Sequence, residues 1–211
     1  MSAVAVRPHE DLGSLRQHPW ITAARTEVVS PPGGSRRTTV RVVPSDAGLA
    51  VLRARGKAAL VGELAGVAPG LPADPRSWRL VDDLALATLD DDDRRNRPRV
   101  RALEVRGGDE LQARLLVPYD LAVFEGHFPT IPLLPGMTQV AWAVGIARGQ
   151  LPGVGALAGI LAAKFRRLVR PGMDLQLRVQ WCAAAGELQF QYRHGDETVS
   201  TGRLRVQATD V

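Results

Sequence analysis

The chain has 211 residues, of which 45% are hydrophobic, 5% aromatic and 23% charged. No apolar run is long enough to span a bilayer, and the composition is typical of a globular protein, so we expect neither a membrane span nor wholesale disorder. The 27 basic residues exceed the 22 acidic ones and give a net charge of +5. A solvated, arginine-rich surface explains this small excess without nucleic acid, and a basic patch for an acidic partner is the alternative.

The cysteine and histidine content argues against disulfides and metal sites. Cys182 is the single cysteine and cannot form an intramolecular disulfide, and residues 1–13 lack the basic and apolar regions of a secretory signal. We therefore expect a cytoplasmic protein. No pair of histidines has the spacing of metal ligands, and one cysteine cannot build a structural zinc site, so we predict no metal.

The first part of the chain has the pattern of a small α+β domain. Residues 38–43 alternate as a strand does, and residues 49–64 carry leucines at roughly helical spacing. Residues 90–99 then form a charged stretch without an apolar face, which we interpret as a linker or solvated turn. We predict two domains, over residues 1–96 and 97–211.

The second part is predicted to be mainly antiparallel sheet. Short apolar stretches alternate with glycine-containing turns, and the expected strands are 100–106, 110–117, 159–168, 175–182, 188–193 and 198–206. Residues 135–148 differ, because they begin with a proline suited to the first helical position and carry apolar residues on every face. A helix of this kind is expected to lie inside a curved sheet.

The most specific motif surrounds His127, in the string FEGHFP at residues 124–129, which PLLPG follows at 132–136. A neutral imidazole can remove a proton near pH 7. Free N–H groups at the start of the next helix can polarise a carbonyl or stabilise an enolate-like oxygen. Both groups suit chemistry at the carbon next to a thioester carbonyl, although a lone histidine in a loop can also be structural.

These strings resemble the FabZ-type 3-hydroxyacyl-acyl-carrier-protein dehydratases, whose signature reads close to F-x-G-H-F-P-x-x-P-[IVL]-x-P-G. The continuation LPGMTQVAW at 134–142 looks most like the branch attached to aryl-polyene pigment clusters, and residues 164–175 are similar to the family's K-F-x-x-x-V-x-P-G-D-x-L hairpin. The resemblance covers about residues 100–207. It implies an α+β hotdog fold, an antiparallel sheet wrapped around a long helix, with two subunits paired edge to edge.

The resemblance also implies roles for individual residues. His127 would remove the alpha proton, the Gly136 amide would bind the thioester carbonyl, and the substrate would arrive on the phosphopantetheine of an acyl carrier protein, with no further cofactor. Candidates for contact with the acyl chain, or for plain core, are Phe124, Phe128, Gln139 and Trp142. Candidates for binding the carrier, or for a solvated sheet edge, are Lys164, Arg166, Arg167 and Arg170.

One expected catalytic group is missing. The acidic residue that the family carries on the central helix falls at Ala141, and no Asp or Glu occurs from Gly126 to Met173. An ordered water held by Gln139, Asp120 or Glu125 is one replacement. A carboxylate from a different hotdog subunit, in a heterodimer rather than a homodimer, is a second. In the third alternative the protein is an inactive subunit or a carrier-binding scaffold.

Residues 17–84 resemble the small C-terminal subdomain of AMP-forming acyl or aryl ligases. The matching strings are HPWI at 18–21 and PRSWRLVDDL at 75–84. The lysine with which such ligases contact the adenylate falls at Asp91, which reverses the charge next to a phosphate. We therefore predict a degenerate ligase remnant in residues 1–96, without adenylating activity, that serves as a stabilising appendage or as a docking surface.

Overall fold

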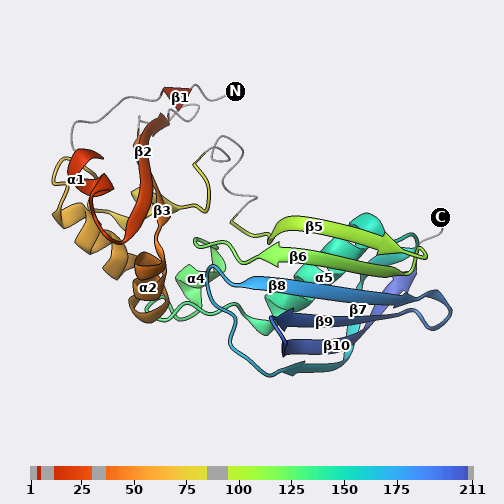
Figure 1. Ribbon diagram of the computed structural model, residues 1–211. Helices are drawn as coiled ribbons and strands as arrows, with labels where there is room; N and C mark the ends of the chain where they lie inside the picture. The colour runs from red at the N-terminus through yellow and green to blue at the C-terminus, as the bar shows by residue number, and fades with distance from the viewer. Residues whose placement is uncertain (1–3, 6–11, 30–36, 85–94, 209–211) are drawn as a thin grey trace. The chain divides into compact units, whose positions relative to one another are not determined.

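The computed structural model describes residues 4–5, 12–29, 37–84 and 95–208 (Figure 1). By its packing the chain divides into two units. The first contains the chain up to Asn96 together with Pro118–Pro132, and the second contains Arg97–Val117 and Leu133–Val211. The segment 118–132, which carries His127, therefore packs with the N-terminal part of the chain, although its sequence belongs to the dehydratase-like region.

The first unit contains a four-stranded sheet with the order β1-β2-β3-β4, in which β4 runs parallel to β3 and the other pairs are antiparallel. A helix, α2, lies between β3 and β4 in the chain. In order, the elements are β1 (Val4–Ala5), α1 (Leu12–Arg16), β2 (Ile21–Val29), β3 (Arg37–Pro44), α2 (Asp46–Gly66), the 3-10 turn η1 (Pro75–Ser77), β4 (Trp78–Leu80) and α4 (Val123–Gly126).

Helix α2 confirms the helix expected over 49–64 and is longer than predicted. Ser45 caps its start, because its hydroxyl accepts a hydrogen bond from the amide of Gly48 at 3.2 Å. Leu60 and Leu64 are fully buried in the core of this unit. The helix is kinked at Gly56, whose φ of 78° and ψ of 175° are not helical.

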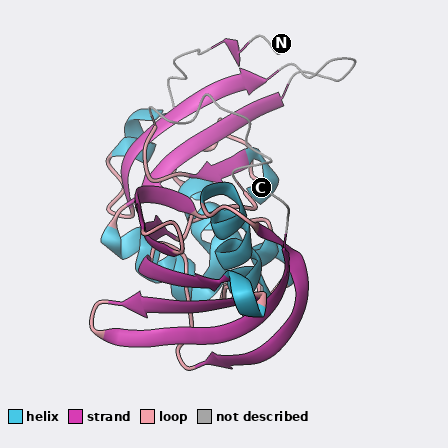
Figure 2. Ribbon diagram, turned by 90° about the vertical axis from the view of Figure 1, so that its right-hand side faces the viewer, coloured by secondary structure: helices cyan, strands magenta, loops and turns pink. Residues whose placement is uncertain are grey.

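The second unit is a six-stranded antiparallel sheet with the order β5-β6-β8-β9-β10-β7, which curves around one long helix, α5 (Figure 2). In chain order, its elements are β5 (Arg99–Arg106), β6 (Glu110–Leu116), α5 (Gly136–Gln150), β7 (Val154–Phe165), β8 (Asp174–Cys182), the 3-10 turn η2 (Ala183–Ala185), β9 (Glu187–His194) and β10 (Glu197–Ala208). This is the α+β hotdog architecture predicted from the sequence.

Alternating side chains make one face of this sheet apolar. Along β8 the residues Leu175, Leu177 and Val179 are buried while their neighbours are exposed or half-buried, as the period of a strand requires. The apolar face and the buried side of α5 form the core of the second unit. None of the helices in the described parts of the chain is long and apolar enough to cross a membrane.

One expectation about this unit is wrong in detail. Strand β7 ends at Phe165 rather than at 168, because the amides of Arg166 and Arg167 both turn to the carbonyl of Val199, at 2.8 and 3.2 Å. Helix α5 lies inside the curved sheet, as expected, and Ala141 and Gly145 are exposed on its surface. The position of the missing carboxylate thus lies on an open face of the helix.

Candidate active site

His127 lies directly after the short helix α4, and its amide donates to the carbonyl of Val123 at 3.0 Å. Its half-buried ring meets the ring of Phe128 edge to face, with centroids 4.6 Å apart. Phe128 has a φ of 57° and, among the described residues, is the one non-glycine with a positive φ. Strained backbone of this kind is uncommon for an aromatic residue and concentrates at functional sites.

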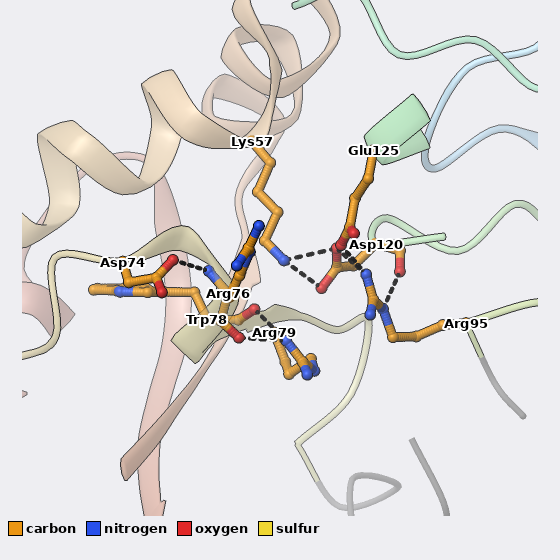
Figure 3. Close-up of polar contacts among 8 residues, drawn as sticks. All are labelled: Lys57, Asp74, Arg76, Trp78, Arg79, Arg95, Asp120 and Glu125. Atoms are coloured by element: carbon orange, nitrogen blue, oxygen red, sulfur yellow. Dashed lines mark hydrogen bonds and ion pairs between the residues drawn. The ribbon is translucent and has the colours of Figure 1, made fainter. Parts of the chain in front are cut away.

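A cluster of charged side chains, in which Lys57, Arg95 and Asp120 are largely buried and Glu125 is exposed, holds the segment that carries His127 (Figure 3). The ammonium group of Lys57 on α2 lies 2.9 Å from both carboxylate oxygens of Asp120. Arg95 forms an ion pair with Glu125, and its guanidinium lies 3.9 Å from the carboxylate of Asp120. Both carboxylates considered as holders of a catalytic water are therefore paired with cations.

Burial decides the electrostatics of this cluster. The side chains of Lys57 and Asp120 are 17% and 7% exposed. Burial lowers the pKa of Lys57 from its ordinary value, the pairing with Asp120 opposes this shift, and the positive charges of Arg79 and Arg95 add to it. A buried pair of this kind is costly to break, because removing one partner leaves the other charge desolvated.

A cavity of about 240 Å³ lies beside this cluster, within the first unit. Its wall is mainly apolar and includes Leu52 and Phe124, while Lys57, Arg76 and Asp120 supply polar groups. Phe124 is thus a buried residue of the N-terminal unit, whereas Phe128 is 58% exposed. These two candidates for contact with the acyl chain have different surroundings.

Gly136 begins α5 in the second unit. The amides of Thr138 and Gln139 donate to the carbonyl of Pro135 at 3.1 and 3.2 Å. The Gly136 amide precedes them, in the part of the first turn whose N–H groups have no acceptor within the helix. The helix orients this N–H toward an acceptor outside the helix. A Cβ added to Gly136 would lie 2.5 Å from Cζ of Phe165, so only glycine allows the ring to cover this helix start.

Gln139 and Trp142 belong to the core of the second unit. The side-chain oxygen of Gln139 accepts a hydrogen bond from Ser200 at 2.6 Å, and its carbonyl accepts one from the hydroxyl of Tyr192 at 3.0 Å. Burial raises the pKa of Tyr192, so this hydroxyl remains a donor. Both Gln139 and Trp142 are buried, and the side-chain oxygen of Gln139 is engaged within the core.

The four basic candidates for carrier binding are not equivalent. Lys164 and Arg166 line an open groove of about 730 Å³ on the sheet, together with Arg178 and Arg203. Arg167 instead pairs with Glu197 at 2.6 Å, and the backbone amide of Arg170 donates to the sulfur of Met173 at 3.1 Å. Sequence reasoning missed Arg178 and Arg203, although each lies at an exposed position of an alternating strand.

Comparison with known proteins places this hotdog unit in a family. The family model of the ApeI dehydratases, ApeI-like, matches residues 104–203. The 3-hydroxyacyl-[acyl-carrier-protein] dehydratase FabZ of Erythrobacter litoralis is 32% identical over 120 residues, which cover 52% of this chain and 78% of that protein. The chain belongs to the FabZ-like dehydratase family.

Two further proteins that are similar to this chain are also dehydratases by name. FabZ of Latilactobacillus sakei is 40% identical to this FabZ-like chain over 86 residues, which span 37% of the chain and 61% of that relative's length. A chain of the dehydratase heterocomplex ApeI:P from Xenorhabdus doucetiae is 32% identical, covers 53% of this chain and 98% of its own length, and has a TM-score of 0.49. The expected relation of residues 17–84 to AMP-forming ligases stays a prediction, and Asp91 lies outside the described residues.

Proposed function

We propose that this protein is a dehydratase subunit that acts on 3-hydroxyacyl thioesters carried by an acyl carrier protein, in fatty-acid or aryl-polyene-type biosynthesis. The observation that carries the proposal is the family's histidine motif, retained in a chain whose central helix begins with an available amide at Gly136. His127 removes the proton from the alpha carbon, and the negative charge that develops on the carbonyl oxygen is stabilised by the Gly136 N–H.

The elimination also needs a proton for the departing hydroxyl group. The electron pair left on the alpha carbon forms the new double bond, the bond between the beta carbon and oxygen breaks, and the oxygen leaves as water once protonated. In this chain Ala141 supplies no proton, and Asp120 and Glu125 are engaged by Lys57 and Arg95. These pairings favour the alternative in which another subunit supplies the acid.

The second unit offers an edge for such a subunit. Strand β7 is an outer strand of the sheet, and its apolar side chains Leu157, Ile160 and Leu161 are each about 40% exposed. A long outer strand with exposed apolar residues is suited to pairing with another sheet. A second copy of this chain would bring a second Ala141, so we propose a heterodimer with a hotdog dehydratase that has a carboxylate on its helix.

Lys164 and Arg166 are proposed to meet the carrier. Their groove also contains Arg178 and Arg203, which pair with Glu110 at 3.2 Å and with Glu187 at 3.6 Å. An acidic carrier surface or the phosphate of phosphopantetheine is the complementary partner of Lys164 and Arg166. If the mixed subunits bind a carrier and show no dehydration, the protein is instead the carrier-binding scaffold considered from its sequence.

The test is an assay with 3-hydroxyacyl-carrier protein as substrate, followed by the absorbance of the enoyl product. The purified protein is assayed alone and then with an acid-bearing hotdog dehydratase whose own histidine has been replaced by alanine. We expect activity in the mixture that falls to a small residual level with His127→Ala in this chain. Undiminished activity of His127→Ala would overturn the proposed role of His127, and equal activity of the protein alone would overturn the heterodimer.

A further inference from the structure

The segment that carries His127 is fastened to the N-terminal unit on both sides of the histidine. Before it, Tyr119 packs against the apolar core of that unit and Asp120 pairs with Lys57. After it, Pro129 packs against Gly56. The contacts with Asp120 and Pro129 come from two neighbouring residues, 57 and 56, at one point of α2.

The kink of α2 allows the second of these contacts. Gly56 is buried in the middle of α2, and its backbone leaves the helical conformation there. A Cβ at this position would lie 1.9 Å from the carbonyl oxygen of Pro129, and the φ of 78° is one that L side chains rarely adopt. The close approach of the Pro129 backbone therefore explains why a glycine interrupts α2 here.

Arg95 binds the same segment through hydrogen bonds and an ion pair. Its carbonyl accepts a hydrogen bond from the amide of Ala122 at 2.8 Å, and its Nε donates to the carbonyl of Asp120 at 3.3 Å. Its guanidinium pairs with Glu125, two residues before His127. Arg95 thus holds α4 through its backbone and its side chain together.

We propose that Lys57 and Arg95 are positioning residues for His127, and that the N-terminal unit sets the orientation in which the imidazole meets the substrate. The inference rests on the proposed function of His127 and gives residues 1–96 a role in catalysis that neither an appendage nor a docking surface includes. Apolar residues of similar volume would fill the site of the buried pair without desolvating two charges. The directional bonds of Lys57 and Arg95 instead define where the segment lies.

The first test replaces Lys57 by methionine, which keeps the length of the side chain and removes its charge. We expect kcat to fall about 10- to 100-fold with KM nearly unchanged, because a displacement on the order of 1 Å at a catalytic group costs about this much. Lys57→Arg should recover most of the rate. Arg55→Met, at an exposed position of the same helix, is the matched control and should leave kcat unchanged.

The decisive comparison is made in the His127→Ala background. If Lys57 acts through His127, Lys57→Met lowers the residual activity of His127→Ala no further. An equal loss in both backgrounds would overturn the proposal, since it would show an effect independent of the imidazole. Should Lys57→Met fail to fold, Arg95→Gln makes the same comparison at the other fastening point.

A readout without turnover separates this inference from the proposed function. The chain has four histidines, and the His127→Ala variant assigns the His127 imidazole resonance in an NMR spectrum. Lys57→Met and Arg95→Gln should shift this resonance, whereas Arg55→Met should not. Unchanged His127 resonances would overturn the positioning role even if the enzyme is active, and shifted resonances in a protein without dehydratase activity would overturn the proposed function alone.

Discussion

Replacing Ala141 by glutamate should give the protein dehydratase activity without a partner. Ala141 lies on the exposed face of α5, so a longer side chain meets open space there. Glutamate is a good helix former, and the substitution should cost less than about 0.5 kcal/mol of folding stability. A positioned acid contributes about 10²- to 10⁴-fold to proton transfer, so we expect a gain within this range over the wild-type protein assayed alone.

Two further variants separate the effect of an acid from other effects. Ala141→Gln has the size of glutamate without a proton to donate at neutral pH. Gly145→Glu places the same charge one turn further along the helix, at a glycine whose added Cβ meets nothing within 4 Å. Activity is measured as enoyl product formed from a 3-hydroxyacyl-carrier protein. No gain from Ala141→Glu, or an equal gain from either control, would refute the reasoning that one carboxylate at residue 141 is the missing component.

Three other expectations follow from the packing and charges. Gly136→Ala should destabilise the protein by about 1–3 kcal/mol in urea unfolding, because its Cβ would lie 2.5 Å from the Phe165 ring; Phe165→Ala in the same chain should relieve the clash. Burial lowers the pKa of Lys57 in the folded protein below 10.5, the ordinary value that applies in the unfolded chain. Between these two pKa values, Lys57 is protonated in the unfolded chain and neutral in the folded protein. The free energy of unfolding should therefore rise with pH in that interval relative to Lys57→Met, and a flat difference would contradict it. Arg166→Glu should weaken carrier binding in a salt-dependent manner in a titration with the carrier, and Arg167→Glu, whose side chain already pairs with Glu197, should have less effect.

The hotdog sheet could be predicted from the sequence because its signals are local. Alternation along residues 175–182 and glycine in the turns are visible in a few consecutive residues, and every expected strand except β7 formed close to its expected position. The end of β7 could not be predicted in this way. Its sequence continues with apolar and basic residues. The strand ends because the amides of Arg166 and Arg167 donate hydrogen bonds to the carbonyl of Val199, which lies far along the chain.

The candidate site shows the same division between local and distant signals. The motif around His127 and the proline-glycine start of the central helix are short strings, so sequence alone could identify them. The pair of Lys57 and Asp120 joins positions 63 residues apart, and no pattern within either segment indicates the other. The one local sign was a glycine followed by one of the chain's two lysines inside the expected helix.

Substitutions at Asp120 and Lys57 distinguish the alternatives for the missing acid. If Asp120 donates the proton, Asp120→Asn should abolish activity, and Lys57→Met should preserve or raise it, because the carboxyl group would no longer be engaged by the ammonium group. If Asp120 only holds the segment, both variants should lower kcat to a similar extent, and the double variant should be no worse than either alone. We expect the second result, since both oxygens of Asp120 already face Lys57 at 2.9 Å. An active Lys57→Met protein beside an inactive Asp120→Asn protein would make Asp120 the acid and remove the need for a second subunit.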